Sequence, residues 1–273
     1  MRVIGLLHPG EMGSAVGTCL TAAGHRVLWA SQGRSSQTAA RARLCALTDA
    51  GTATELAGRA DIVVSVCPPH AALGVARSAI GFGGVYLDAN AIAPGTAREV
   101  AAIVESGGAT YVDGAIIGPP PASPGTTRLY LSGPAAVEVR DLFAGTALEA
   151  RIITAQNRAG AAAGGKPDVA ASAVKMAYAA WTKGSAALLL TARALAEAHG
   201  VAGALRAEWE MSQPGLQVRA RSAERSATAK GWRWTAEMEE IAATMAAAGL
   251  PPGFHLAAAE VFLGYPREPA AAD

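Results

Sequence analysis

The stretch Gly5-Leu6-Leu7-His8-Pro9-Gly10-Glu11-Met12-Gly13, near the start of the chain, decides the fold. An apolar run with the character of a buried strand leads into it, and a pattern of helical period follows it. A glycine-rich turn between a strand and a helix is the setting of a dinucleotide-binding fingerprint. The last two glycines of the pattern GxGxxG correspond to Gly10 and Gly13, whereas His8 replaces the first glycine.

This glycine turn has the chemistry to hold a pyrophosphate. Gly10 would let the backbone approach the phosphates, and Gly13 would let the helix pack closely on the strand. The N-terminus of the helix adds free N–H groups and a partial positive charge. We expect His8 to adopt the turn with its ring over the cofactor; the alternative is a plain strand-to-helix turn. The expected cofactor contacts in this turn are His8, Pro9, Gly10, Glu11, Met12 and Gly13.

The end of the second strand indicates which dinucleotide binds. NAD enzymes usually place a carboxylate there to accept hydrogen bonds from the ribose hydroxyls. Here the strand from Arg26 to Ala30 is followed by Ser31-Gln32-Gly33-Arg34-Ser35, which contains no carboxylate. Ser31, Arg34 and Ser35 can bind a 2′-phosphate, because hydroxyls donate to it and a guanidinium supplies a planar cationic fork. The sequence therefore predicts NADPH rather than NADH, with a solvated turn as the alternative.

The first half of the chain alternates short apolar runs with amphipathic helical patterns, such as Gly13 to Ala23 and Thr96 to Glu105. Near-continuous apolar strands separated by helices are typical of a parallel sheet that is covered on both faces. Right-handed crossovers then give a doubly wound α/β sheet. The expected strands are Val3 to Leu7, Val27 to Ala30, Ile62 to Val66, Val85 to Leu87, Thr110 to Val112 and Arg128 to Leu131.

The strand signals stop after about Thr154, so we expect a Rossmann domain over residues 1–153 and an all-α domain over residues 154–273. Breaks at Pro214, at Gly231 and at Gly249 to Pro252 separate the helices. We expect a flexible stretch from Gly160 to Pro167 and a frayed tail from Pro266. The expected helices are Val169 to His199, Ala204 to Met211, Leu216 to Ser226, Trp234 to Ala248 and Gly253 to Phe262.

Composition excludes several classes of protein. Of the 273 residues, 51% are hydrophobic and 16% are charged, which is typical of a globular chain with a large core. The net charge of +1 and the absence of a basic stripe argue against a nucleic-acid partner. No apolar run is long enough to span a membrane and no signal leader precedes the first strand, so we expect a cytoplasmic protein. The three scattered cysteines and five histidines lack metal-ligand spacing, and we expect no metal.

Four motifs resemble the β-hydroxyacid dehydrogenase and 6-phosphogluconate dehydrogenase superfamily, and the resemblance covers most of the chain. The family's first motif, G-F-I-G-L-G-x-M-G, is similar to Gly5 through Gly13, and its substrate motif D-x-S-T-x-x-P is similar to Asp88-Ala89-Asn90-Ala91-Ile92-Ala93-Pro94. The other two are Val64-Ser65-Val66-Cys67-Pro68-Pro69 and Asp113-Gly114-Ala115-Ile116-Ile117-Gly118-Pro119. The resemblance implies that Cys67 and Pro68 lie near the cofactor, that Asn90 contacts cofactor and substrate, and that the Gly118 loop binds substrate.

The resemblance also implies a catalytic lysine on the first long helix after the sheet. Lys175 occupies that place in Ala171-Ser172-Ala173-Val174-Lys175-Met176. A lysine there would protonate the alkoxide that hydride transfer leaves, or remove the hydroxyl proton in the reverse direction. Burial beside a nicotinamide would lower its pKa from about 10.4 toward neutrality. Position 179 is Ala where the family has Asn, which puts the native substrate in doubt.

The helical half resembles a less characterised branch of the superfamily, in Trp181-Thr182-Lys183-Gly184 and Trp232-Arg233-Trp234. By the family's spacing, Lys183 would hold an acidic group of the substrate; the alternative is a solvated helix end. Tyr178 is a candidate to line the pocket, although aromatics at helical spacing more often belong to the core. Glu237, Glu239 and Glu240 are interpreted as a solvated or capping face. The resemblance also implies a homodimer through the helical domain, in which a partner can complete the active site.

Three functions are compatible with these residues. The leading hypothesis is an NADPH-dependent dehydrogenase or reductase that acts on a small 3-hydroxy acid or a related β-hydroxy or keto compound. The second is an imine reductase, which retention of Lys175 disfavours and Ala179 keeps open. The third is a nucleotide-binding sensor without turnover, which would explain His8 in the glycine turn.

Overall fold

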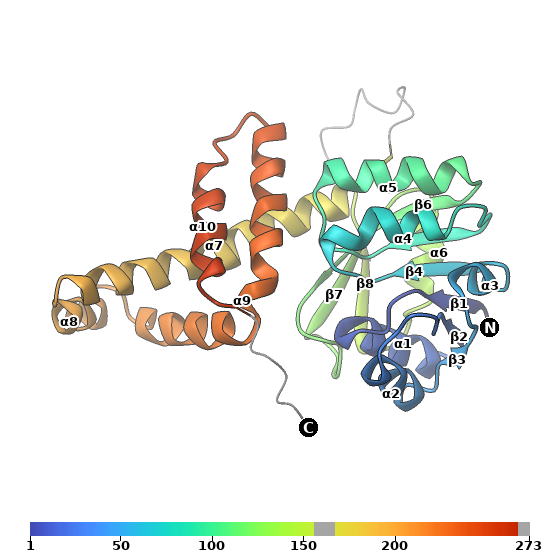
Figure 1. Cartoon of the computed structure of the whole chain (residues 1–273), viewed down its shortest axis with the longest axis horizontal. Helices are drawn as coiled ribbons and strands as arrows, with labels where there is room; N and C mark the ends of the chain where they lie inside the picture. The colour runs from blue at the N-terminus through green and yellow to red at the C-terminus, as the bar shows by residue number, and fades with distance from the viewer. Residues whose placement is uncertain (156–166, 267–273) are drawn as a thin grey trace. The chain divides into compact units, whose positions relative to one another are not determined.

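The computed structural model describes residues 1–155 and 167–266 of the chain (Figure 1). The chain forms two compact units, Met1–Lys175 and Met176–Asp273, and each is described by itself. The last strand of the first unit ends at Ile152, next to the expected domain boundary. Most of the stretch expected to be flexible, and the expected frayed tail after Pro266, lie outside the described residues.

The first unit contains one sheet of eight strands in the order β3-β2-β1-β4-β5-β6-β7-β8. All neighbouring strands are parallel except β6 and β7, which are antiparallel. The six expected strands are present, and the doubly wound α/β fold is confirmed. The strands are β1 (Val3–Leu6), β2 (Arg26–Trp29), β3 (Thr48–Asp49), β4 (Ile62–Ser65), β5 (Val85–Asp88), β6 (Thr110–Ile117), β7 (Thr127–Ser132) and β8 (Leu148–Ile152).

Both faces of the sheet are buried, which explains the near-continuous apolar strands. Ile62 and Val64 of β4 face one apolar cluster, whereas Val63 faces the other. Helices α1 (Glu11–Ala22), α2 (Ser36–Leu44) and α6 (Ala136–Asp141) contribute to the first cluster. Helices α3 (Ala53–Ala57), α4 (Ala72–Ser78) and α5 (Pro94–Ser106) contribute to the second. Figure 1 shows α4 and α5 on one side of the strands and α1 and α2 on the other.

Strand β6 is longer than its parallel neighbour β5 and extends past the carboxyl end of β5. It pairs with β5 as far as Asp113 and with β7 from Asp113 to Ile117. The sequence pattern predicted a strand that stops at Val112, because Gly114 interrupts the apolar run. The additional residues carry the β6 backbone beyond the end of β5.

The second unit is helical. Helix α7 (Ala170–Ala198) begins in the first unit and continues into the second. The second unit also contains α8 (Ala202–Ser212), α9 (Leu216–Ala247) and α10 (Gly253–Leu263). Helices α7, α9 and α10 pack around an apolar cluster that includes Met238 and Phe262. Among the described residues, no helix combines the length and the apolar character that crossing a bilayer requires.

The expected break at Gly231 is wrong, because α9 runs through it as one continuous helix. A Cβ atom at Gly231 would lie 2.7 Å from the Cβ of Tyr265. Glycine therefore serves close packing of α9 against the segment after α10. Sequence alone cannot distinguish a glycine that ends a helix from one that admits a neighbour.

Candidate cofactor and active site

The turn between β1 and α1 is shaped to receive a phosphate group. Gly10 is the N-cap of α1, and no side chain caps the first turn of the helix. A Cβ atom at Gly10 would meet nothing within 4 Å, so the backbone faces open space there. A Cβ atom at Gly13 would collide with the carbonyl oxygen of His8, so the close packing of helix on strand requires glycine. Gly13 thus has the packing role that the sequence predicted. The predicted contact of Gly10 with a pyrophosphate remains a prediction, to which an uncapped helix N-terminus is suited.

His8 fits the first glycine position without strain, because its backbone does not adopt a positive φ. Its side chain is half-buried, and within the described part of the chain its Nδ1 atom has no hydrogen-bond partner. Burial, and secondarily the charge of Arg34, lowers the pKa of His8 to about 4. The imidazole is therefore neutral at physiological pH, and the predicted contact of His8 with the cofactor remains a prediction.

Two guanidinium groups contact the backbone of the same turn. Arg34 Nη2 lies 3.5 Å from the carbonyl oxygen of Leu7, and Arg41 Nε donates to the carbonyl oxygen of Pro9 at 3.3 Å. Ser35 caps α2, where its hydroxyl accepts from the Thr38 backbone N–H at 3.3 Å. This pair of cations suits the 2′-phosphate that distinguishes NADPH from NADH. The sequence analysis missed Arg41, although it lies on the helix that begins directly after Ser35.

Asn90 joins the loops that follow β4 and β5. Its Oδ1 accepts from the Cys67 backbone N–H at 2.6 Å, and its Nδ2 donates to the Ser65 hydroxyl at 3.1 Å. Its own N–H donates to the Asp88 carboxylate at 3.1 Å, and the residue is 3% exposed. These bonds hold the Cys67-Pro68 segment beside the carboxyl ends of β1 and β4. The amide is thus committed to neighbours in the chain, and its predicted contacts with cofactor and substrate remain predictions.

Burial changes the ionisation of the groups around Asn90. It raises the pKa of the Cys67 thiol to about 12, so this cysteine is not a thiolate nucleophile at neutral pH. It also raises the pKa of Asp88 to about 7, with the nearby charge of Asp113 acting in the same direction. Tyr111 donates to Asp88 from its hydroxyl at 3.4 Å. Within the described residues, no cluster of three or more His, Cys, Asp or Glu is arranged to hold a metal ion.

Asp113 attaches the first turn of α7 to the sheet. Its carboxylate accepts from the Ser172 hydroxyl at 2.5 Å and from the Ser172 N–H at 2.8 Å. Ser132 donates to the same carboxylate at 3.3 Å and accepts from the Ala171 N–H at 3.2 Å. Burial raises the pKa of Asp113 to about 6, although the hydrogen bonds from Ser172 favour its charged form. No sequence pattern predicts this attachment, because Asp113 and Ser172 are 59 positions apart along the chain.

Lys175 is held at the carboxyl edge of the sheet. Its Nζ donates to the carbonyl oxygen of Ile116 at 2.8 Å, and the residue is half-buried. Burial lowers the pKa of the amine to about 8. Strand β6 therefore contacts α7 twice at matching intervals, through Asp113 to Ser172 and through Ile116 to Lys175. An amine with this pKa gains and loses a proton near physiological pH, which is what an acid–base catalyst requires.

Gly118 follows β6 and has a φ of +131°, in the region that favours glycine. A Cβ atom at this position would lie 2.5 Å from the Thr126 carbonyl oxygen. The Thr127 hydroxyl donates to the Pro119 carbonyl oxygen at 2.6 Å and fixes the start of the loop. Gly118 is exposed two residues beyond the carbonyl that binds Lys175, a position that suits its predicted contact with substrate.

In the second unit, Lys183 forms an ion pair with Glu237, and both side chains are mostly buried. The Lys183 Nζ also lies 5.8 Å from the centre of the Trp234 ring. The interpretation of Glu237 as part of a solvated face is wrong, because only 13% of its side chain is exposed. Ala179 belongs to the apolar cluster of this unit, whereas Tyr178 is exposed. The predicted substrate contacts of Lys183 and Tyr178 remain predictions.

Two family comparisons cover separate parts of the chain. Residues 3–88 match the family described as NADP oxidoreductase, coenzyme F420-dependent. Residues 196–263 match a domain of unknown function, DUF1932. The chain thus joins an NADP oxidoreductase domain to a C-terminal helical domain of the second family. Among proteins with curated annotation, none matches the chain in sequence.

Solved structures share the fold over nearly the whole chain. A conserved protein of unknown function, described as structurally similar to 3-hydroxyacid dehydrogenases, is 27% identical with a TM-score of 0.70, covering 96% of each chain. A 3-hydroxyisobutyrate dehydrogenase from Salmonella typhimurium is 19% identical with a TM-score of 0.70, covering 97% of this chain and 94% of that one. A reductive aminase from Aspergillus terreus, solved with NADPH4, is 19% identical with a TM-score of 0.60, covering 96% and 90%. The resemblance to β-hydroxyacid dehydrogenases is confirmed in fold, and residues 3–88 match an NADP oxidoreductase family.

Proposed function

We propose that the protein transfers a hydride between NADPH and a small 3-hydroxy acid or a related β-hydroxy or keto compound. The observation that carries this proposal is the amine of Lys175, held at the carboxyl edge of the sheet with a pKa near 8. Ligands of doubly wound sheets bind at this edge, beside the point where the strand order reverses. NADPH supplies the hydride when it is bound.

The residues of the first unit divide the work of binding. The first turn of α1, with Gly10, would hold the pyrophosphate, and Arg34 with Arg41 would hold the 2′-phosphate. Asn90 orders the loop after β4 along which the cofactor would extend. Lys175 in its ammonium form donates a proton to the oxygen that becomes a hydroxyl, and its neutral amine removes that proton in oxidation. The acid group of the substrate is assigned to the Gly118 loop, which follows β6.

The test is turnover by the full-length protein with NADPH and a panel of β-keto acids, compared with a cyclic imine. We expect turnover of a β-keto acid, and we expect Lys175→Ala to lower kcat by about 10²- to 10⁴-fold. Lys230→Ala, which changes an exposed lysine of α9, is the matched control and should leave kcat unchanged. Undiminished turnover in Lys175→Ala would exclude the proposed proton donor. Turnover of the imine alone would favour the reductive-amination alternative, and tight NADPH binding without any turnover would favour a sensor.

We also propose that the protein is a homodimer through its helical unit. Trp181, Leu188 and Leu195 of α7 are 65%, 56% and 61% exposed, and they recur at intervals of seven residues. This spacing places the three side chains along one stripe of the helix, as in helices that pair with another helix. A continuous exposed apolar stripe is unfavourable in water, and burial against a second copy would relieve that cost.

A further inference from the structure

A cavity of about 160 Å³ lies in the second unit, between α7, α8 and α9. Small side chains, including Ala196 and Ala220, leave the space open. Helix α8 contributes no buried residue, and its apolar Leu205 and Trp209 are only half-buried where they line the cavity. The protein's own side chains therefore leave an apolar hollow beneath this helix.

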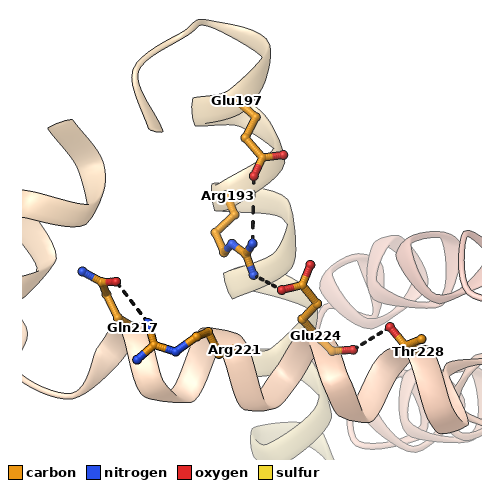
Figure 2. A network of polar contacts seen from close by, with 6 residues as sticks. All are labelled: Arg193, Glu197, Gln217, Arg221, Glu224 and Thr228. Atoms are coloured by element: carbon orange, nitrogen blue, oxygen red, sulfur yellow. Dashed lines mark hydrogen bonds and ion pairs between the residues drawn. The ribbon is translucent and has the colours of Figure 1, made fainter. Parts of the chain in front are cut away.

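Three arginines line the same cavity, and one of them is already neutralised. Arg193 Nη1 lies 2.6 Å from the Glu224 carboxylate, and its Nη2 lies 3.9 Å from Glu197, which also lines the cavity (Figure 2). The hydrogen bond that Arg193 donates to Glu224 raises the pKa of Arg193 and holds the guanidinium in place. Glu224 thus offsets the charge of Arg193.

The other two, Arg206 and Arg221, have no carboxylate within ion-pair distance among the residues that the structure describes. Arg221 Nη1 lies 3.5 Å from the amide oxygen of Gln217 (Figure 2). The Gln217 Nε2 donates to the Arg206 carbonyl oxygen at 3.0 Å and to Glu210 at 2.7 Å. Gln217 therefore ties the backbone of α8 to the Arg221 guanidinium of α9, and both arginines line the one hollow, where their exposed guanidiniums can reach an anion.

We propose that this cavity binds a small monocarboxylate with a compact apolar body. Glu224 offsets the charge of Arg193, so the remaining charged groups of the lining are the guanidiniums of Arg206 and Arg221 and the carboxylate of Glu197. Their net charge is +1, which a ligand with one negative charge would neutralise. Guanidiniums bind carboxylates in bidentate geometry, and the indole and alkyl wall receives the apolar body. Cavities of about 150 Å³ accept a benzene ring, which sets the size of that body. The site lies wholly within the helical unit and does not depend on the proposed hydride transfer.

Calorimetric titration of the full-length protein with benzoate, benzyl alcohol and acetate tests the two ligand features separately. Benzyl alcohol has the ring without the carboxylate, and acetate has the carboxylate without the ring. We expect benzoate to bind at one site per chain and at least about tenfold more tightly than either of the others. Only benzoate can contact both the arginines and the apolar wall of the cavity. Benzyl alcohol binding as tightly as benzoate would overturn the anion site. Saturating NADPH should leave the benzoate affinity unchanged, whereas displacement by NADPH would place benzoate in the Rossmann unit and overturn the proposal.

Variants locate the binding within the cavity. The double variant Arg206→Gln/Arg221→Gln should weaken benzoate binding at least about tenfold. Ala202→Leu, which adds volume to the cavity wall, should do the same. Arg225→Gln removes an exposed arginine of α9 that does not line the cavity, and should bind as the parent protein does. Undiminished binding by the double variant would overturn the proposal, as would the absence of saturable binding of benzoate, cyclohexanecarboxylate and 4-methylpentanoate alike.

Discussion

At the scale of single residues, Lys175 shows how a fold sets a proton affinity. A lysine in water titrates near about 10.4, so at neutral pH its amine cannot serve as a base because it is almost always protonated. Burial beside the end of β6 disfavours that charge and lowers the pKa to about 8, while the Ile116 carbonyl binds the proton-bearing amine. The residue type came from the sequence, but the lowered pKa depends on packing that only the structure shows.

The pH dependence of turnover should report this lysine. Reduction needs the protonated amine, so kcat/KM for the keto substrate should be highest below about pH 8 and fall as pH rises through it. Oxidation needs the neutral amine, so its kcat/KM should rise through the same pH. Rates measured in both directions from pH 6 to 10 check this. Parallel profiles in the two directions would contradict a proton held by Lys175.

The two arginines at the glycine turn should determine cofactor preference. Arg34→Ala and Arg41→Ala should each raise the Kd for NADPH about tenfold, because each removes a charge-assisted bond to the 2′-phosphate. The Kd for NADH should change little, since NADH has a hydroxyl there. Arg43→Ala, which alters an exposed arginine on the same helix, is the control for fluorescence titration. Equal weakening of NADPH and NADH by Arg41→Ala would assign Arg41 a role in the fold of the turn.

At the scale of elements, the spacing of apolar residues and the positions of glycine and proline predicted most of the helices and strands. The six expected strands are present, and α7 begins and ends within one residue of its expected bounds. The two-residue β3 and the amphipathic β8 were missed, since neither forms a buried apolar run. In the candidate site, the glycine turn could be predicted because its residues are neighbours in the sequence. The contact between Asp113 and Ser172 could not, because these residues are 59 positions apart.

Gly231 and Gly203 offer a matched test of what a helical glycine does. Both lie inside helices, but a Cβ at Gly203 would meet nothing within 4 Å, whereas one at Gly231 would overlap Tyr265. Gly203→Ala should raise the free energy of unfolding by up to about 1 kcal/mol through helix propensity. Gly231→Ala should lower it by about 1–3 kcal/mol, because α9 and Tyr265 must separate. Urea denaturation of both variants checks the opposite signs, and stabilisation by Gly231→Ala would contradict the packing role.

At the scale of the whole molecule, the change of apolar period near residue 154 separated an α/β half from a helical half, and the fold has this division of structure types. The sequence could not reveal which helix face stays exposed. Trp181, Leu188 and Leu195 are apolar at helical positions, and apolar residues at such positions are more often buried in the core of their own chain. Their exposure depends on how α7 packs against α9 and α10, which the sequence pattern does not specify.

The exposed stripe on α7 predicts the effect of one charge on assembly. Leu188→Glu should convert a dimer to a monomer in light scattering coupled to size exclusion, because a buried carboxylate at the centre of the stripe is unpaired. Leu44→Glu places the same charge on an exposed leucine of α2 and should leave the mass unchanged. A parent protein that is monomeric at high micromolar concentration would refute the dimer.

The double attachment of α7 to β6 has a consequence for how this architecture diversifies. The hydroxyl and backbone N–H of Ser172 and the amine of Lys175 all bond to β6, so the first unit itself fixes the position of the amine that we propose as the proton donor. The helices that follow can therefore change their side chains without relocating the amine. Selection on such a scaffold acts on recognition and reactivity as separable traits.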